Sequence, residues 1–172
     1  MRFQSEARQP FYNARVTLLR FLMMLSLGIW VGGIVLFAVL APTAFSALPT
    51  RHLAGSIVGP MLNKLHWIGL ISGIIFLIAS VLLSRITTGD LHILSARNLL
   101  VCVMLALTLI SQFGVTSRMA TLRSSMGEID NTPVNDPARV EFNTLHAWST
   151  RLEVTILLLG LAALYRTAAG LG

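Results

Sequence analysis

The amino-acid sequence predicts an all-α protein, a four-helix transmembrane bundle with both termini on the same side of the membrane. Of its 172 residues, 55% are hydrophobic and 12% are charged, and the mean hydropathy is +0.75. This charged fraction is about half that of a typical soluble domain. Four apolar stretches, at 21–41, 65–84, 99–117 and about 145–165, each reach the roughly 20 residues that cross a bilayer. Because these four spans leave little room for a further domain, we predict a single four-span integral membrane domain over 1–172.

The positive charge of the chain points to the membrane rather than to nucleic acid. The net charge is +6 and the sequence pI is about 11.1. The arginines stand singly at the ends of apolar runs and form no basic stripe of the kind that nucleic acid requires. At helix ends, such side chains reach toward lipid phosphates. We therefore predict contact with the lipid bilayer and no nucleic-acid partner.

Prolines set the expected end of the first helix and an expected bend before the second span. The first helix is predicted to end at Pro42, because proline lacks the backbone donor and clashes with the preceding turn. The connector that follows contains Pro49. Residues 53–64 are predicted to form a further helical stretch, bent at Pro60, before the second span.

The links around the third span differ in length. A short polar link precedes the span, and a long one covers 118–142. Asp136 followed by Pro137 is typical of an N-cap and a first helical residue. A fourth helix that starts there and runs to Tyr165 is about 43 Å long at 1.5 Å per residue. It is therefore expected to project beyond the hydrocarbon core of roughly 30 Å.

Basic residues decide the predicted orientation. The side of the termini holds Arg2, Arg8, Arg15, Arg20, Arg85, Arg97 and Arg166, and the loop side holds Arg51, Lys64, Arg118, Arg123, Arg139 and Arg151. Lys64 and Arg151 are expected to lie partly within the membrane, so they count less. Because cytoplasmic loops carry the excess of basic residues, we predict cytoplasmic termini.

Three pairs of glycines are spaced four residues apart. They are Gly28 and Gly32, Gly55 and Gly59, and Gly69 and Gly73. Small residues at this spacing let membrane helices approach closely. We predict that they pack the helices of this bundle together; the alternative is a homodimer interface.

Two histidines mark one level of the predicted bundle. His66 lies 19 residues before the arginine that closes the second span, and His146 lies 20 residues before the arginine that closes the fourth. The second and fourth helices run in the same direction, so both imidazoles are expected at the same depth on the loop side. Trp67 and Trp148 accompany them, as aromatic residues do at a membrane interface.

Further polar residues gather near this level. Glu153 and Ser149 follow the fourth-helix histidine on the same helical face, and Gln112 lies at a similar depth on the third helix. A buried carboxylate in hydrocarbon needs a partner or water. Lys64 and Arg118, from neighbouring helices, are the predicted partners of Glu153. The terminal half of the bundle is almost wholly apolar by comparison.

Three interpretations of this polar cluster stay open. In the first, the histidines bond to the backbone or to head groups, and Glu153 belongs to a structural ion pair. In the second, His66 and His146 face each other and ligate haem b or a soft metal. In the third, the cluster lines a half-open cavity for a small ligand or a transported species. No nucleophile set, phosphate loop or HExxH motif is present, so we predict a non-enzymatic protein.

Several motifs resemble a known family. They are LGIWVGGIVLFAVLAPTAF at 27–45, AGSIVG at 54–59, RM at 118–119 and FNTLHAWS at 142–149. This pattern is similar to that of the transmembrane protein 205-like family, which is classed as domain of unknown function 4149. The matching positions are Trp30, Gly33, Pro42, Phe45, Gly55, Gly59, Arg118, Phe142, His146 and Ser149. The tryptophan with its glycines, followed by a histidine helix, is also similar to copper-resistance D-type membrane proteins.

The resemblance implies a four-helix membrane protein with a link to metal-drug resistance, and it implies no established chemistry. His66 and Glu153 have no assigned place in its pattern. We therefore expect a non-enzymatic protein that holds a ligand or metal near one membrane face. The alternatives are an accessory subunit of a larger membrane complex, for example a respiratory one, and a small b-type cytochrome.

Overall fold

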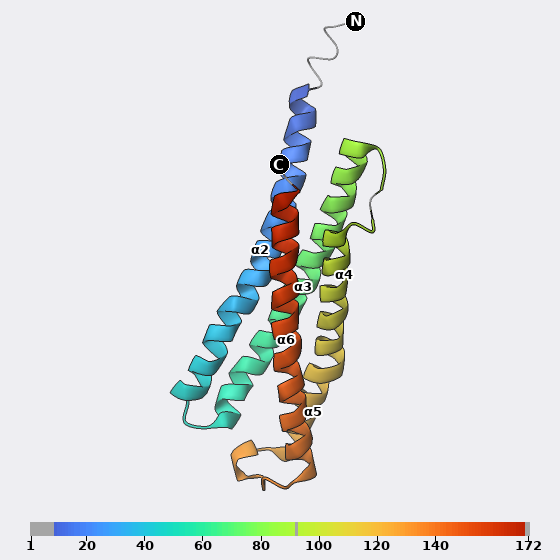
Figure 1. The fold of residues 1–172 in the computed structure, drawn as a ribbon. Coiled ribbons are helices and arrows are strands. Elements are labelled where there is room, and N and C mark those ends of the chain that lie inside the picture. The colour runs from blue at the N-terminus through green and yellow to red at the C-terminus, as the bar shows by residue number, and fades with distance from the viewer. Residues whose placement is uncertain (1–8, 92, 171–172) are drawn as a thin grey trace, which may run out of the picture.

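The computed structural model describes residues 9–91 and 93–170, and these form four long helical segments (Figure 1). The segments are α2 at Gln9–Ala47, α3 at Arg51–Thr88, a third helix of consecutive parts, and α6 at Pro137–Ala169. The third consists of α4 at Ala96–Leu109, a π-helix η1 at Ile110–Thr116, and α5 at Ser117–Met126, and a 3₁₀ turn η2 at Ile129–Asn131 follows it. No strand occurs among the described residues.

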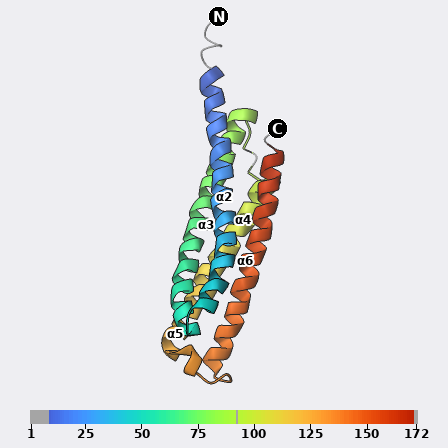
Figure 2. The same cartoon turned by 90° about the vertical axis from the view of Figure 1, so that its left-hand side faces the viewer.

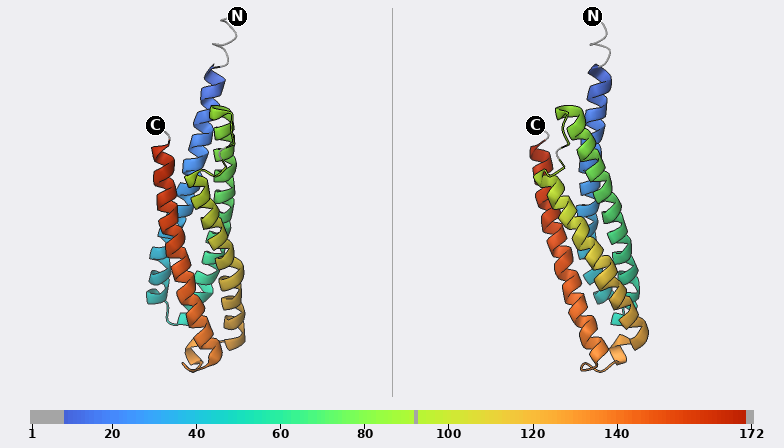
Figure 3. Two further views of the ribbon diagram at one scale, coloured as in Figure 1. Left: turned by 45° about the vertical axis from the view of Figure 1, so that its right-hand side comes forward. Right: turned by 90° about the vertical axis from the view of Figure 1, so that its right-hand side faces the viewer.

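Each helical segment is long and apolar enough to cross a membrane, and each contains an 18-residue stretch whose mean hydropathy lies between 1.5 and 2.4. The predicted all-α four-helix fold is thereby confirmed, and the protein is an integral membrane protein. The helices close into a ring in which α2 lies between α3 and α6, and α4 lies between the same two (Figures 2 and 3). The described chain ends lie at the same end of the bundle as the link between α3 and α4 (Figure 1). Arg2 and Arg8, used above for the orientation, lie outside the described residues.

The prolines do not end helices. α2 continues through Pro42 to Ala47, so the predicted end at Pro42 is wrong. The predicted helical stretch at 53–64 is confirmed, because α3 is one helix from Arg51 onward with Pro60 inside it. A proline removes one hydrogen bond of its helix, and long apolar helices tolerate that loss because their other backbone bonds and their packing persist.

The true helix ends are formed by specific caps. Thr50 accepts the Leu53 amide through its hydroxyl at 3.1 Å, and α3 ends at Gly89, whose φ of 79° suits glycine. The Asp136 carboxylate accepts the amides of Ala138 at 2.8 Å and Arg139 at 3.4 Å. This confirms the predicted start of the fourth helix.

The core is apolar and centres on one aromatic side chain. Trp30 of α2 is 2% exposed, and its indole lies directly against Gly69 and Gly73 of α3. A side chain added at either glycine would collide with the ring. Fully buried residues surround this contact: Met23, Leu27, Phe76, Val101, Met104 and Ile156.

The other glycine pairs do not behave alike. Gly55 and Gly59 lie beside the Arg123 guanidinium of α5. Gly28 and Gly32 have no atom of another helix within 4 Å of a Cβ built on them, and both are exposed. The predicted internal packing through this first pair is therefore wrong, because that face of α2 points away from α3 and α6.

Candidate functional site

A buried hydrogen-bond network joins three helical segments. The His66 Nδ1 lies 2.8 Å from Gln112 Oε1, and the His66 Nε2 lies 2.7 Å from Glu153 Oε1. His66 is 2% exposed and the Glu153 side chain 12%. Three of the four side chains that the depth argument placed at one level therefore meet inside the bundle.

Helix geometry brings these side chains together. His66 lies on the buried face of α3 and Glu153 on the inner face of α6. Gln112 belongs to η1, where the π-helical bonding widens one stretch of the third helix. Such π segments are frequent at functional sites. Here the segment carries the amide that fixes the imidazole of His66.

The hydrogen-bond geometry fixes how protons are arranged. With Gln112 Oε1 as acceptor, His66 Nδ1 is the donor. The 2.7 Å contact between Nε2 and the Glu153 carboxyl then holds one proton, on the nitrogen or on the oxygen. Either an imidazolium with a carboxylate or a neutral imidazole with a carboxylic acid results, and the pair has no net charge in either form. The low-dielectric interior therefore tolerates it.

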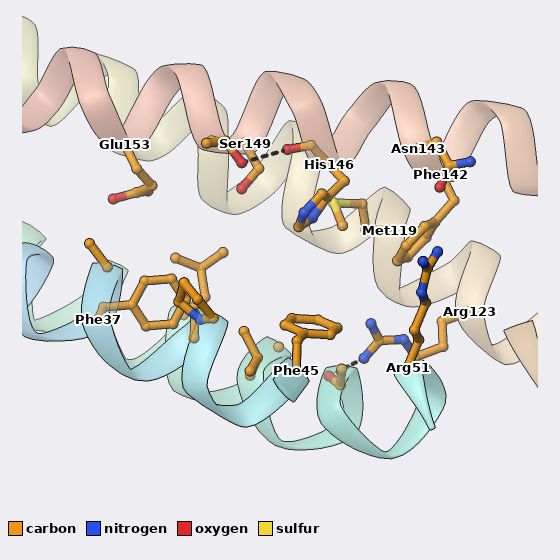
Figure 4. A pocket seen from close by; sticks show the side chains of 18 of the residues that line it. Phe37, Phe45, Arg51, Met119, Arg123, Phe142, Asn143, His146, Ser149 and Glu153 are labelled. Atoms are coloured by element: carbon orange, nitrogen blue, oxygen red, sulfur yellow. Dashed lines mark hydrogen bonds between the residues drawn. The ribbon is translucent and has the colours of Figure 1, made fainter. Parts of the chain in front are cut away.

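Glu153 also lines a pocket of about 500 Å³ between α2 and α6 at the loop end of the bundle. Figure 4 shows α6 along one wall, with His146, Ser149 and Glu153 directed toward the space. The α2 wall opposite is apolar and includes Phe37 and Phe45. One wall thus offers polar groups and the other hydrocarbon.

Of the other predicted site residues, two line the pocket and two lie outside it. Ser149 is 5% exposed and lines the pocket. His146 also lines the pocket, but it is exposed and lies seven residues before Glu153 on α6, so it is outside the buried network. Lys64 is exposed on α3 and is not among the lining residues. Arg118 binds Glu141 through two hydrogen bonds, at 2.7 Å and 2.9 Å, outside the pocket.

The predicted partners of Glu153 were therefore wrong, since His66 takes that role. Arg118 cannot reach Glu153, because Glu141 and Glu153 are separated on α6 by about 18 Å at 1.5 Å per residue. The same regular rise explains why the depth estimate succeeded. Counting residues gives the depth of a side chain in the membrane but not the rotation of its helix, and the rotation decides which side chain it meets.

Sequence reasoning missed the arginines at the loop end of the pocket. Arg51, Arg123 and Arg139 all line it. Arg123 donates to the Gly55 carbonyl, and its guanidinium lies 5.5 Å from the centre of the Phe142 ring. The sequence assigned Arg123 to a long link, whereas α5 extends the third helix beyond it. The only early signal was that Gly55 and Phe142 belong to the recognised motifs.

A metal site finds limited support in this arrangement. Within residues 9–91 and 93–170, no three His, Cys, Asp or Glu side chains are grouped to hold a metal ion. Both ring nitrogens of His66 are already hydrogen-bonded. Haem ligation by His66 would therefore require one of these contacts to break.

Comparison with known families places the chain. The domain of unknown function DUF4149 matches residues 25–128. The chain belongs to the DUF4149 family. The match covers most of α2, all of α3 and the third helix, so the DUF4149 region includes His66 and Gln112, while His146 and Glu153 of α6 lie beyond it. No curated protein and no solved structure matches the chain.

Proposed function

We propose that this protein binds a small ligand, without chemically transforming it, in the pocket between α2 and α6. The observation that carries the proposal is the pocket itself. It has about 500 Å³ of space, an apolar wall, and three polar side chains that converge from α6: His146, Ser149 and Glu153. Small-ligand sites combine this size with mostly apolar walls and a few placed polar groups.

The buried network supports this proposal by explaining how Glu153 is held. One carboxylate oxygen is fixed by His66, whose ring is in turn fixed by Gln112. Glu153 is therefore oriented from behind while its side chain borders the pocket. Such orientation before binding lowers the entropy cost of recognition.

A substitution that fills the pocket tests the proposal. Ala41 lines the pocket, whereas Leu36 of the same helix is 59% exposed and does not. Small molecules that copurify with the protein in mild detergent are extracted and measured by mass spectrometry. We expect a stoichiometric compound in the wild type and in the Leu36→Trp control, and its loss in Ala41→Trp. Equal recovery from all three proteins would contradict the proposal.

The same samples test the cofactor alternatives. An absorption spectrum with a Soret band that disappears in His66→Ala and His146→Ala would make the protein a b-type cytochrome. Metal analysis would detect a bound soft metal in the same way. Under our proposal neither signal is stoichiometric, and the compound found in the pocket is organic.

A second candidate function is association with another membrane chain, as an accessory subunit or a homodimer. Gly28 and Gly32 support it, because both are exposed on α2 and no atom of another helix lies within 4 Å of a Cβ built on either. Small residues at this spacing favour close helix contacts in lipid. Cross-linking in native membranes tests it. We expect a cross-linked product in the wild type that is lost in the double variant Gly28→Leu with Gly32→Leu. A monomeric chain in both proteins would contradict this function.

We further propose that the end of the bundle carrying the termini faces the cytoplasm. The excess of basic residues there, after those expected within the membrane are discounted, supports this orientation. The pocket would then open toward the opposite membrane face.

A further inference from the structure

Charge is distributed unevenly along the pocket. Arg51 begins α3, Arg123 lies on α5, and Arg139 is in the first turn of α6, and all three line the loop end. None of them forms an ion pair with another described residue. The hydrogen bonds that Arg123 and Arg139 donate go to neutral backbone carbonyls, of Gly55 and Thr132.

The opposite end of the pocket has a different character. Figure 4 shows Arg51 and Arg123 at one end and Glu153 at the other, with His146 between them. Among the described lining residues Glu153 is the one carboxylate, and His66 already neutralises it. The loop end is thus a cluster of cationic groups without anionic partners, a strong site for an anion.

Hydrocarbon connects the two ends. The α2 wall runs from Ile34 to Phe45, a length of about 16 Å at 1.5 Å per residue. One leaflet of a bilayer contributes about 15 Å of acyl chain to the core. The apolar wall therefore matches one acyl chain that lies along the membrane normal with its head group at the loop end.

We propose that the ligand is a single-chain lipid whose head group is a phosphate monoester. This rests on the proposed ligand-binding function. Three guanidinium groups suit a monoester, which carries about −1.5 to −2 charges at neutral pH and offers three acceptor oxygens. A space of about 500 Å³ is that of a small-ligand site, so it takes one chain rather than two. His146 then lies beside the polar linker between phosphate and chain, where its ring hydrogen-bonds a hydroxyl or ester oxygen.

Native mass spectrometry of the full chain, titrated with lysophosphatidic acid, tests this assignment. We expect Arg51→Gln to weaken binding by about tenfold or more, since it removes a charge-assisted hydrogen bond. Arg51 is exposed at the start of its helix, so this change preserves folding. Arg118→Gln is the matched control, because Arg118 pairs with Glu141 outside the pocket. Binding to this control equals binding to the wild type.

The competing ligands distinguish the features that are recognised. A fatty acid of the same chain length binds more weakly, lysophosphatidylcholine binds more weakly still, and inorganic phosphate does not compete at equal concentration. Ala41→Trp abolishes binding because it occupies the space for the chain. Equal binding of all three amphiphiles, or an equal effect of Arg51→Gln and Arg118→Gln, would overturn the assignment.

Failure of this assignment is separable from failure of the proposed function. A wild-type protein that does not bind lysophosphatidic acid, yet retains another compound that Ala41→Trp loses, refutes the lipid assignment and leaves ligand binding in place. A protein that retains no compound in any variant and binds none of the probes refutes both.

Discussion

The side chain of His66 has both ring nitrogens hydrogen-bonded inside the bundle, one to Gln112 and one to Glu153. Glu153 and Glu141 make the comparison direct, since each is a carboxylate of α6 with a basic partner on another segment. Glu153 and His66 are 12% and 2% exposed, whereas Glu141 and Arg118 are 42% and 52% exposed. Water screens the second pair and leaves the first dependent on its own contacts.

Removing Glu153 should therefore be costly. In Glu153→Ala the Nε2 of His66 loses its partner while it stays buried, and we expect the free energy of unfolding to fall by about 1–3 kcal/mol. Thermal unfolding in detergent measures the change. Glu141→Ala is the matched control, with a smaller effect because its site is solvated. Equal destabilisation by the two substitutions would show that the buried network is not stabilising.

The residue scale also shows what counting along a sequence can do. The depths of His66, Gln112 and Glu153 followed from a constant rise per residue, and these three side chains do meet. The identity of the pair did not follow. It depends on how each helix is rotated about its axis, and around Gln112 that rotation is altered by a π-helix that no sequence pattern announced.

Among the elements, α2 and α3 form a contact that depends on the absence of side chains at two positions. Gly69→Leu places a side chain where the Trp30 indole lies, so we expect destabilisation of at least about 1–3 kcal/mol. Gly28→Leu, on the exposed face of α2, should leave the unfolding temperature of the isolated chain unchanged or raise it, because glycine is a poor helix former. Thermal unfolding of both variants in detergent tests this, and loss of stability in Gly28→Leu alone would contradict the packing described.

The start of α6 provides a second test. Asp136 accepts two amides of the first turn, so Asp136→Ala is expected to cost about 1 kcal/mol. Asp90 is a suitable control, since its described hydrogen bonds involve its backbone rather than its carboxylate. Unfolding of Asp90→Ala at the wild-type temperature, with a lower temperature for Asp136→Ala, is the expected result. The reverse order would contradict the cap.

Elements were predictable where the sequence signal is local. The Asp136–Pro137 pair starts a helix because both residues act within one turn. Pro42 misled because its local effect is outweighed by apolar helix on both sides. A proline inside a long membrane helix is thus a weak boundary signal.

In the whole molecule, the link between α3 and α4 lies at one end of the bundle, and the link between the third helix and α6 lies at the other (Figure 1). Leu94, between α3 and α4, is 90% exposed, and Val134, between the third helix and α6, is 68% exposed. Cysteines at these positions, in a background with Cys102→Ser, should react with a membrane-impermeant maleimide from opposite sides of the membrane. We expect Leu94→Cys to react from the cytoplasmic side. Labelling of both from one side would contradict a four-span topology, and labelling of Leu94→Cys from outside would reverse the orientation.

At this scale the sequence was most informative, because the number of spans depends only on hydrophobicity and length. The pocket could not be foreseen in the same way. Its walls come from α2 and α6, and its loop end requires α3, α5 and the first turn of α6 to converge. The lining residues are far apart in the sequence, so no short stretch of sequence predicts that they meet.

The pairing of α2 with α6 also has a consequence for biogenesis. Of the four described helical segments, the two that enclose the pocket leave the ribosome first and last, and Glu153 belongs to the later of them. Until then His66 sits in a partial bundle with an imidazole nitrogen that only water or lipid can satisfy. Docking of the final segment therefore completes both the cavity and the buried pair in one event, and a chain truncated before Pro137 inserts three helices with neither.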